Sequence, residues 1–236
     1  MRSPVNYGVI GAALAYAAIA VHPLALAQTL ADGPESLLGR EMAERRIPGL
    51  QVAVVDRGRI AWLRSFGIAD LQSASPVTDQ TAFSINSCTK AFTGVAIMQL
   101  VEAGRVDLAA PVSRYVDGLP DPWQRVTIRQ LLTHVSGLPD ILSISNPSIG
   151  KIVGDGSEEA AWARLLTLPL DFPTGERFSY NQTNYVLLGK VIERLNGRPF
   201  VEAFADRQFR IAGMPHTGFG DSRDIVPGRA PSYRYV

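Results

Sequence analysis

A serine and a lysine stand three positions apart in the run from Ser87 to Lys90. On a helix, side chains with this spacing lie on one face about one turn apart, so the Lys90 amine can approach the Ser87 hydroxyl. A serine activated by an adjacent base is a nucleophile that can form an acyl intermediate. Ser148 and Lys151 have the same spacing, so the spacing alone does not select the catalytic pair.

The elements that must hold each pair separate the two candidates. Between Ser87 and Ala103, apolar residues recur at helical spacing, with Asn86 available as N-cap and Gly104 as the stop. The recurring residues are Ala91, Val95, Met98 and Val101. We therefore expect an amphipathic helix that opens at Ser87 and buries this apolar face, which gives the pair a rigid mount.

Ser148 stands in a different setting. Residues 142–157 are rich in Ser, Gly, Asn and Pro, which predicts a long surface loop of the kind that borders a binding cleft. No helix is expected there to hold the second pair. The Ser87 pair is also favoured because a helix N-terminus offers free N–H groups and positive potential to an oxyanion at the acyl adduct. Tyr180, if brought alongside, could share the proton that Lys90 accepts.

Composition excludes several other classes of function. Among residues outside the predicted leader, the histidines are His134 and His216, far apart and without a His-Glu-x-x-His pattern, so we expect no metal and no other cofactor. Cys88 is the single cysteine, so no internal disulfide can form, and we expect it to pack as a small side chain. We expect His134 to fix a turn. No Gly-x-Ser-x-Gly is present, which disfavours an α/β-hydrolase.

The N-terminus predicts export to the periplasm or outside the cell. Arg2 precedes an apolar run from Gly8 to Val21 that is too short to span a bilayer, and small residues over 25–27 suit a cleavage site. Removing residues 1–27 deletes one basic residue and no acid, so the formal net charge falls from +1 to zero. A neutral chain disfavours nucleic acid or an anionic membrane as partner, and we expect a small-molecule substrate instead.

The order of elements predicts an α+β fold. A helix is expected over about 37–46, followed by a β-hairpin from Leu50 to Gly67 that turns at residues 56–59. Later segments predict helices: a capping box at 127–130, a helix over about 158–167, and one closed by Gly197 before Pro199 begins another. The face of that third helix is marked by Tyr185, Leu188, Ile192 and Leu195. No repeat or long linker divides the chain, so residues 28–236 are expected to form one domain.

Several motifs in order resemble the superfamily of serine β-lactamases, penicillin-binding DD-peptidases and related esterases, particularly its class C-like branch. The likeness runs from about Ile47 to Arg229 and includes the Ser-x-Thr-Lys helix, the segment LLTHVSGLPD over 131–140 and the segment FSYNQTNYVLLG over 178–189. The resemblance implies a fold with an antiparallel sheet flanked by helices plus a helical lobe. It also implies a hydrolase that acylates its serine with a β-lactam, a D-Ala peptide of peptidoglycan or a small ester.

The resemblance also assigns roles to residues. Ser87 is then the nucleophile, Lys90 its base, and Tyr180 the tyrosine of the family's Tyr-x-Asn element, acting in proton transfer. Gln182 occupies the third place of that element, where the family has Asn. The extra methylene moves the amide by more than about 1 Å, so Gln182 is a substrate-binding candidate whose usual task Asn181 or Asn184 could take over.

The family's third element, Lys-Thr-Gly or a His-x-Gly variant, is absent from the sequence. We therefore expect a chain that lacks the C-terminal strands of the resembled fold, either as a fragment of an active hydrolase or as an inactive remnant that serves as a binding module. The hairpin would then be a lone two-stranded ribbon.

Overall fold

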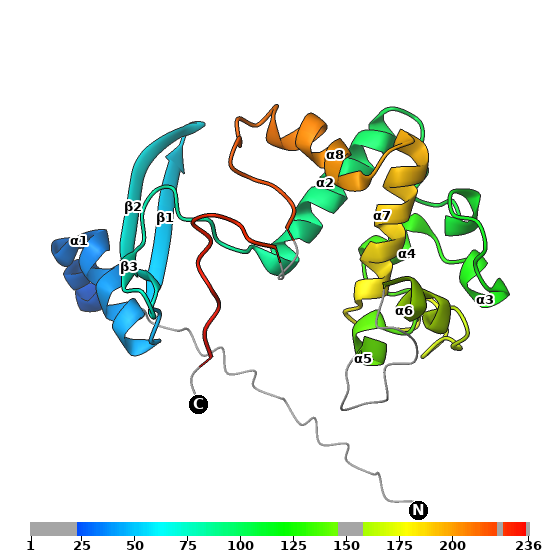
Figure 1. Ribbon diagram of the computed structural model, residues 1–236, viewed down its shortest axis with the longest axis horizontal. Helices are drawn as coiled ribbons and strands as arrows, with labels where there is room; N and C mark the ends of the chain where they lie inside the picture. Colours follow the sequence, from blue (N-terminus) through cyan, green and yellow to red (C-terminus); the bar gives the residue numbers. More distant parts are fainter. Residues whose placement is uncertain (1–22, 146–157, 221–223, 235–236) are drawn as a thin grey trace, which may run out of the picture. The chain divides into compact units, whose positions relative to one another are not determined.

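The computed structural model of the protein describes residues 23–145, 158–220 and 224–234. Among these, the residues up to Thr81 together with those from Ala230 form one compact unit, and Ala82–Arg229 form a second. Figure 1 labels the α-helices and β-strands of each unit. Most of the predicted export signal, in residues 1–22, lies outside the described part, as does the second Ser-x-x-Lys pair, Ser148 and Lys151.

The first unit contains a helix and a small sheet. Helix α1, Pro23–Glu44, is interrupted at Gly33 (φ 74°, ψ 164°), and its second half confirms the helix expected from residue 37, which ends at Glu44. The predicted hairpin is confirmed as strands β1, Gly49–Asp56, and β2, Arg59–Asp70, paired antiparallel. A short strand β3, Ser75–Pro76, pairs with β2, so the sheet has the order β1-β2-β3 and the expected lone ribbon is wrong.

The hairpin turn and the last described segment hold this unit together. Arg57 and Gly58 both have positive φ, 48° and 75°, which is the backbone twist that a two-residue hairpin turn requires. The Tyr233 hydroxyl accepts a hydrogen bond from the Leu71 N–H at 2.7 Å and donates one to Asp70 Oδ1 at 2.9 Å. The C-terminal segment is thereby fastened to the far end of β2.

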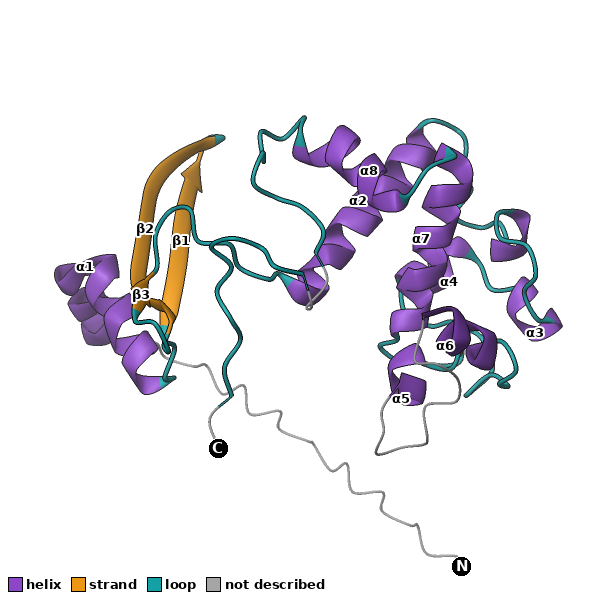
Figure 2. Ribbon diagram, viewed as in Figure 1, coloured by secondary structure: helices purple, strands orange, loops and turns teal. Residues whose placement is uncertain are grey.

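The second unit is built mainly from helices, whereas the three named strands lie in the first (Figure 2). Its elements are η1 Asn86–Cys88, α2 Thr89–Glu102, η2 Val112–Arg114, α3 Asp121–Gln124, α4 Ile128–Leu132, α5 Ile141–Ser145, α6 Glu158–Leu165, α7 Gln182–Asn196, α8 Phe200–Phe204 and η3 Ala205–Phe209. The core between them includes Ile97, Trp123, Ile128, Leu131, Leu165, Leu187, Leu188 and Ile192, each of which is fully buried. Helix α7 contributes four fully buried apolar side chains to this core.

The predicted start of α4 and the predicted end of α7 are both confirmed. Thr127 and Gln130 form the complete capping box of α4, in which each side chain accepts a hydrogen bond from the other residue's backbone N–H. Helix α7 ends at Gly197, whose φ of 67° is the left-handed conformation of a C-cap. The predicted face of α7 is confirmed, since Leu188 and Ile192 are fully buried and Tyr185 and Leu195 are half-buried.

The predicted face of α2 is wrong. Val95 and Met98 are 49% and 48% exposed, and the buried face consists of Thr93, Ala96, Ile97 and Leu100. The helix TKAFTGVAIMQLVE is apolar on almost every side, so hydrophobic spacing does not select one face of it.

The expected loop over 142–157 is also wrong at its start. Residues 141–145 form α5, and Asp140 precedes it with its carboxylate accepting from the Leu142 N–H at 3.2 Å. Residues 146–157 lie outside the described part.

Gly137 is the point where the segment before α5 meets the segment before α7. Its φ is 77°, and a Cβ at this position would lie 2.1 Å from the backbone oxygen of Phe172. The Asp171 N–H donates to the Gly137 carbonyl at 2.8 Å. Only glycine permits this approach, because any side chain would collide with backbone that cannot move aside.

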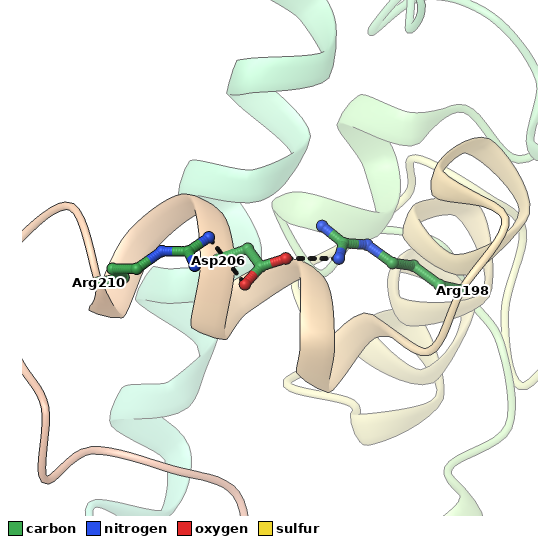
Figure 3. Close-up of polar contacts among 3 residues, drawn as sticks. All are labelled: Arg198, Asp206 and Arg210. Carbon is green, nitrogen blue, oxygen red and sulfur yellow. Dashed lines mark hydrogen bonds and ion pairs between the residues drawn. The ribbon is translucent and has the colours of Figure 1, made fainter.

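An ion-pair cluster braces the turn after α8. The carboxylate of Asp206 in η3 accepts from Arg198 at 2.5 Å and from Arg210 at 2.9 Å, so it lies between the two guanidinium groups (Figure 3). The hydrogen bond from Arg198 and the positive charges of Arg210, Arg198 and Arg207 lower the pKa of Asp206. The segment η3 is a π-helical turn, and the cluster joins its start to the loop before α8.

Candidate active site

Ser87 lies in the short 3-10 turn η1 that runs directly into α2, so it stands at the N-terminal end of that helix. Asn86 is not the N-cap that the sequence predicted: its φ is 45°, and no side-chain cap bond forms at this end. A non-glycine residue in the left-handed region is uncommon, and such strain gathers at functional sites. Ser87 is exposed, as a nucleophile that meets substrate must be, and Cys88 is exposed rather than packed.

Lys90 is half-buried one turn further along and reaches the start of α7. Its Nζ donates a hydrogen bond to Gln182 Oε1 at 2.6 Å. Gln182 is therefore in contact with the predicted base despite its extra methylene. Lys90 Nζ also lies 4.8 Å from the ring centre of Tyr180 and 5.2 Å from that of Tyr185. Two aromatic faces thus stabilise the lysine head in one place.

Tyr180 completes the cluster. Hydrogen bonds from Lys90 first, then from Ser87 and Gln182, lower the pKa of the Tyr180 phenol. The side chain is 48% exposed, so its hydroxyl is open to a substrate as well as to its neighbours. The structure therefore brings together Ser87, Lys90 and Tyr180, the residues that the sequence assigned to catalysis, with Gln182 beside them.

Asn181 has a different place from the one predicted for it. Its side chain is 4% exposed, donates to the Leu138 carbonyl and accepts from the Asn184 N–H at 3.3 Å, which makes it the N-cap of α7. Asn184 is fully buried, where its Oδ1 accepts from the Ser136 hydroxyl at 2.6 Å. Both amides are committed to the protein, so they hold the start of α7 and are not presented to a substrate.

The segment 134–141 fixes where Tyr180 and Gln182 lie. The Gln182 N–H donates to Asp140 Oδ1 at 3.1 Å, a favourable place for a carboxylate because it faces a helix N-terminus. The Thr183 hydroxyl donates to the Pro139 carbonyl at 2.7 Å. Sequence reasoning missed Asp140 and Thr183 as supports of the site. The signal that could have found them is an acid and a hydroxyl beside a predicted helix start.

A cavity of about 530 Å³ opens beside Ser87. Its polar lining comes from η1, the start of α2 and α7, and its apolar lining comes from α7, α8 and the segment after η3. The lining residues are Asn86, Ser87, Thr89, Lys90, Thr93, Gln182, Tyr185, Val186, Gly189, Lys190, Phe200, Phe204 and Phe219. Phe219 packs against Phe200 and Phe204 with ring centres 5.1 and 5.3 Å away. The cavity therefore joins the predicted nucleophile to an aromatic wall.

Within the residues that the structure describes, no group of three or more His, Cys, Asp or Glu side chains is placed to hold a metal ion. Over the same residues, no helix has the length and apolar character needed to cross a membrane. The side chains that gather beside Gln182 are the Ser87 hydroxyl, the Lys90 amine and the Tyr180 phenol.

The model of the Beta-lactamase family matches residues 34–235. The chain belongs to this family. Protein flp of Staphylococcus aureus strain MW2 is 26% identical over 189 residues, which cover 78% of this chain and 37% of that protein. Esterase EstB of Burkholderia gladioli is 32% identical over 212 residues, which cover 82% of this chain and 52% of the esterase. The chain thus spans between about a third and a half of these two curated relatives.

A solved structure confirms the fold predicted from the resemblance. A penicillin-binding protein from Bacillus halodurans is 33% identical with a TM-score of 0.67, and the match covers 82% of this chain and 59% of that one. The described residues therefore have the β-lactamase and transpeptidase-like arrangement of helices with a small antiparallel sheet. The relatives include a protein named as an esterase.

Proposed function

We propose that the protein is a serine hydrolase that forms an acyl-enzyme on Ser87. The observation that carries the proposal is the position of Lys90: its Nζ is fixed by Gln182 at 2.6 Å and lies 4.8 Å from the Tyr180 ring centre, in a cavity lining that also includes Ser87. In the proposed reaction, Ser87 Oγ attacks the substrate carbonyl while its proton passes to Lys90 and Tyr180. The same groups return a proton to the leaving group, and water then hydrolyses the acyl-enzyme.

Small esters, β-lactams and D-Ala peptides of peptidoglycan are the proposed substrate class. The relative named as an esterase supports an ester, and the relative named as a penicillin-binding protein supports a β-lactam. The three classes share an electrophilic carbonyl and an acyl-enzyme step. The cavity of about 530 Å³ beside Ser87 is large enough for the acyl portion of any of them.

Covalent labelling tests the proposal directly. The protein is incubated with p-nitrophenyl acetate or with penicillin, digested, and the peptides are mapped by mass spectrometry. We expect an adduct on the peptide that contains Ser87, its loss in Ser87→Ala, and slowing by about 10²- to 10⁴-fold in Lys90→Ala. Ser148→Ala and Lys151→Ala are the matched controls, since they remove the other pair of the same spacing.

The pattern of labelling separates the outcomes. An adduct that survives Ser87→Ala, or equal losses from Ser87→Ala and Ser148→Ala, would overturn the assignment of the nucleophile. Absence of any adduct from a folded wild-type protein would leave the family fold serving as a binding module.

We also propose that the protein is exported and that residues 28–236 belong to the mature hydrolase domain. The support is the sequence pattern of residues 1–27. N-terminal sequencing of the protein from the periplasm or medium of an expressing cell tests this. A mature N-terminus near residue 28 is expected, and an uncleaved protein in the cytoplasm would contradict it.

A further inference from the structure

His134 lies directly behind the proposed proton-transfer residues. Its side chain is 7% exposed, and its ring centre is 4.7 Å from that of Tyr180 and 5.1 Å from that of Tyr185. Phe178 closes a third side at 5.9 Å. Lys90 Nζ lies over the same two tyrosine rings. The histidine is therefore part of one stack that ends at the lysine.

Its hydrogen bonds determine which ring nitrogen carries the proton. The Asn181 backbone N–H donates to His134 Nδ1 at 3.2 Å, and a backbone amide has no other role than donor. The Asn184 side-chain amide nitrogen lies 3.1 Å from the same atom. Nδ1 must therefore be an unprotonated acceptor, and the neutral ring carries its proton on Nε2.

The backbone of His134 is also hydrogen-bonded to the segment that precedes α7. The Ser179 N–H donates to the His134 carbonyl at 2.8 Å, and the His134 φ is 58°. The residues on both sides of Tyr180, Ser179 and Asn181, are thus both hydrogen-bonded to the one histidine. Any change at His134 acts on the backbone that aims the phenol.

We propose that His134 is a positioning residue whose neutral ring holds Tyr180 in reach of Lys90 and Ser87, and that its protonation switches the site off. The proposal rests on the proposed function for its effect on turnover. Protonation would place a hydrogen on Nδ1 facing the Asn181 N–H, so both would be donors and the contact would be lost. It would also add a positive charge to the stack that already holds the Lys90 head.

The surrounding charges favour the neutral form. Burial first, and then the positive charge of Lys90 on α2, lower the pKa of His134, while Asp140 at the start of α5 opposes this. Tyr180 and Tyr185 are the other titratable groups in contact with the ring. Since the usual histidine value is about 6.5, the switch is expected below that pH.

Two substitutions separate the acceptor from the ring. His134→Asn puts an amide oxygen at the position of Nδ1, cannot titrate, and suits the positive φ because Asn tolerates the left-handed region. His134→Phe keeps an aromatic ring in the stack and removes the acceptor. Melting temperatures of both variants identify any general loss of folding.

The decisive measurement is the pH profile of kcat and KM with p-nitrophenyl acetate from pH 4.5 to 8. We expect an acid limb in the wild type that His134→Asn lacks, with activity at pH 8 within about threefold of wild type. In His134→Phe we expect kcat to fall by about tenfold or more with little change in KM, because Tyr180 is no longer aimed. The same acid limb in wild type and His134→Asn would overturn the proposal.

A second readout does not depend on turnover. In ¹H–¹⁵N NMR spectra, the Asn181 amide of the wild type is expected to shift with pH at the point where His134 takes up its proton, and this shift is absent from His134→Asn. If the wild type shows no acylation but the Asn181 amide titrates as expected, the proposed function fails and the positioning contact stands. If the amide does not respond to pH, the inference fails whatever the activity.

Discussion

Lys90 donates its hydrogen bond to Gln182 Oε1 at 2.6 Å, so the residue at the third place of the Tyr-x-Asn element is long enough to reach the lysine. The Gln182 backbone is fixed by Asp140 at 3.1 Å. With the backbone held, the side-chain length decides whether the amide reaches Lys90. The extra methylene of Gln182 therefore lets its amide oxygen reach Lys90.

Gln182→Asn tests that length. Asparagine places its amide more than about 1 Å short, so the bond to Lys90 is lost unless α7 moves. A hydrogen bond of this kind contributes about 1 kcal/mol, so acylation by p-nitrophenyl acetate is expected to slow by roughly fivefold to tenfold. Stopped-flow release of p-nitrophenol measures it. Acylation at or above the wild-type rate would show that an asparagine at position 182 reaches Lys90 as well as glutamine does.

Tyr180→Phe removes one oxygen from an exposed position. Because the side chain is 48% exposed, the free energy of unfolding is expected to stay within about 0.5 kcal/mol of wild type. Loss of the proton-transfer group should slow turnover by about 10²-fold or more. Steady-state kinetics and thermal melting on one preparation measure both. Unaltered turnover would remove Tyr180 from the mechanism.

Gly189→Leu fills the cavity from α7. A Cβ at Gly189 would meet only Phe200 Cδ1 at 3.8 Å, an ordinary contact, so the larger side chain can enter the open space. We expect phenylacetyl esters to lose about tenfold or more in kcat/KM relative to acetyl esters, because a filled pocket excludes the bulkier group. Gly94→Leu is the control, a helical glycine of α2 with nothing within 4 Å of the added Cβ and no place in the cavity lining. An unchanged acyl preference in Gly189→Leu would remove the cavity from substrate binding.

The Asp206 cluster makes a prediction about acid stability. Since Arg198 lowers the folded-state pKa of Asp206, the cluster stabilises the fold above the unfolded value of about 3.9. That contribution is lost as the pH falls through the folded-state pKa. Asp206→Asn should therefore melt below wild type at pH 7, and the difference should shrink once the pH falls below the unfolded value of about 3.9. Asp117→Asn is the control, because its partner Arg194 lies 3.4 Å away and its carboxylate is 83% exposed. Equal losses of melting temperature in both variants would show that the Asp206 cluster stabilises the fold no more than an exposed ion pair does.

The sequence predicted those parts of the molecule that local chemistry determines. The Thr127–Gln130 capping box, the Gly197 C-cap and the hairpin turn at residues 56–59 each depend on neighbouring residues, and each is confirmed. The buried face of α2 depends on what packs against it, and a helix that is apolar all round does not encode that choice locally.

The candidate site divides in the same way. Ser87, Lys90 and Tyr180 could be found from spacing and motif, because their chemistry is in their residue types. The roles of Asn181 and His134 could not, since both depend on the meeting of 134–140 with 180–184. The bond between Lys90 and Gln182 joins residues 92 positions apart and likewise follows from the fold alone.

Gly137 has a consequence for how this protein can vary. The Phe172 carbonyl oxygen lies where a Cβ at this position would be only 2.1 Å away. The segment around Gly137 also carries His134 and Asp140. In a library that replaces each residue in turn and selects for acylation, position 137 should therefore accept no amino acid other than glycine. Exposed positions such as Val95 and Met98 on α2 should accept many. The positions that tolerate no substitution would then include residues that support the site as well as residues that carry out its chemistry.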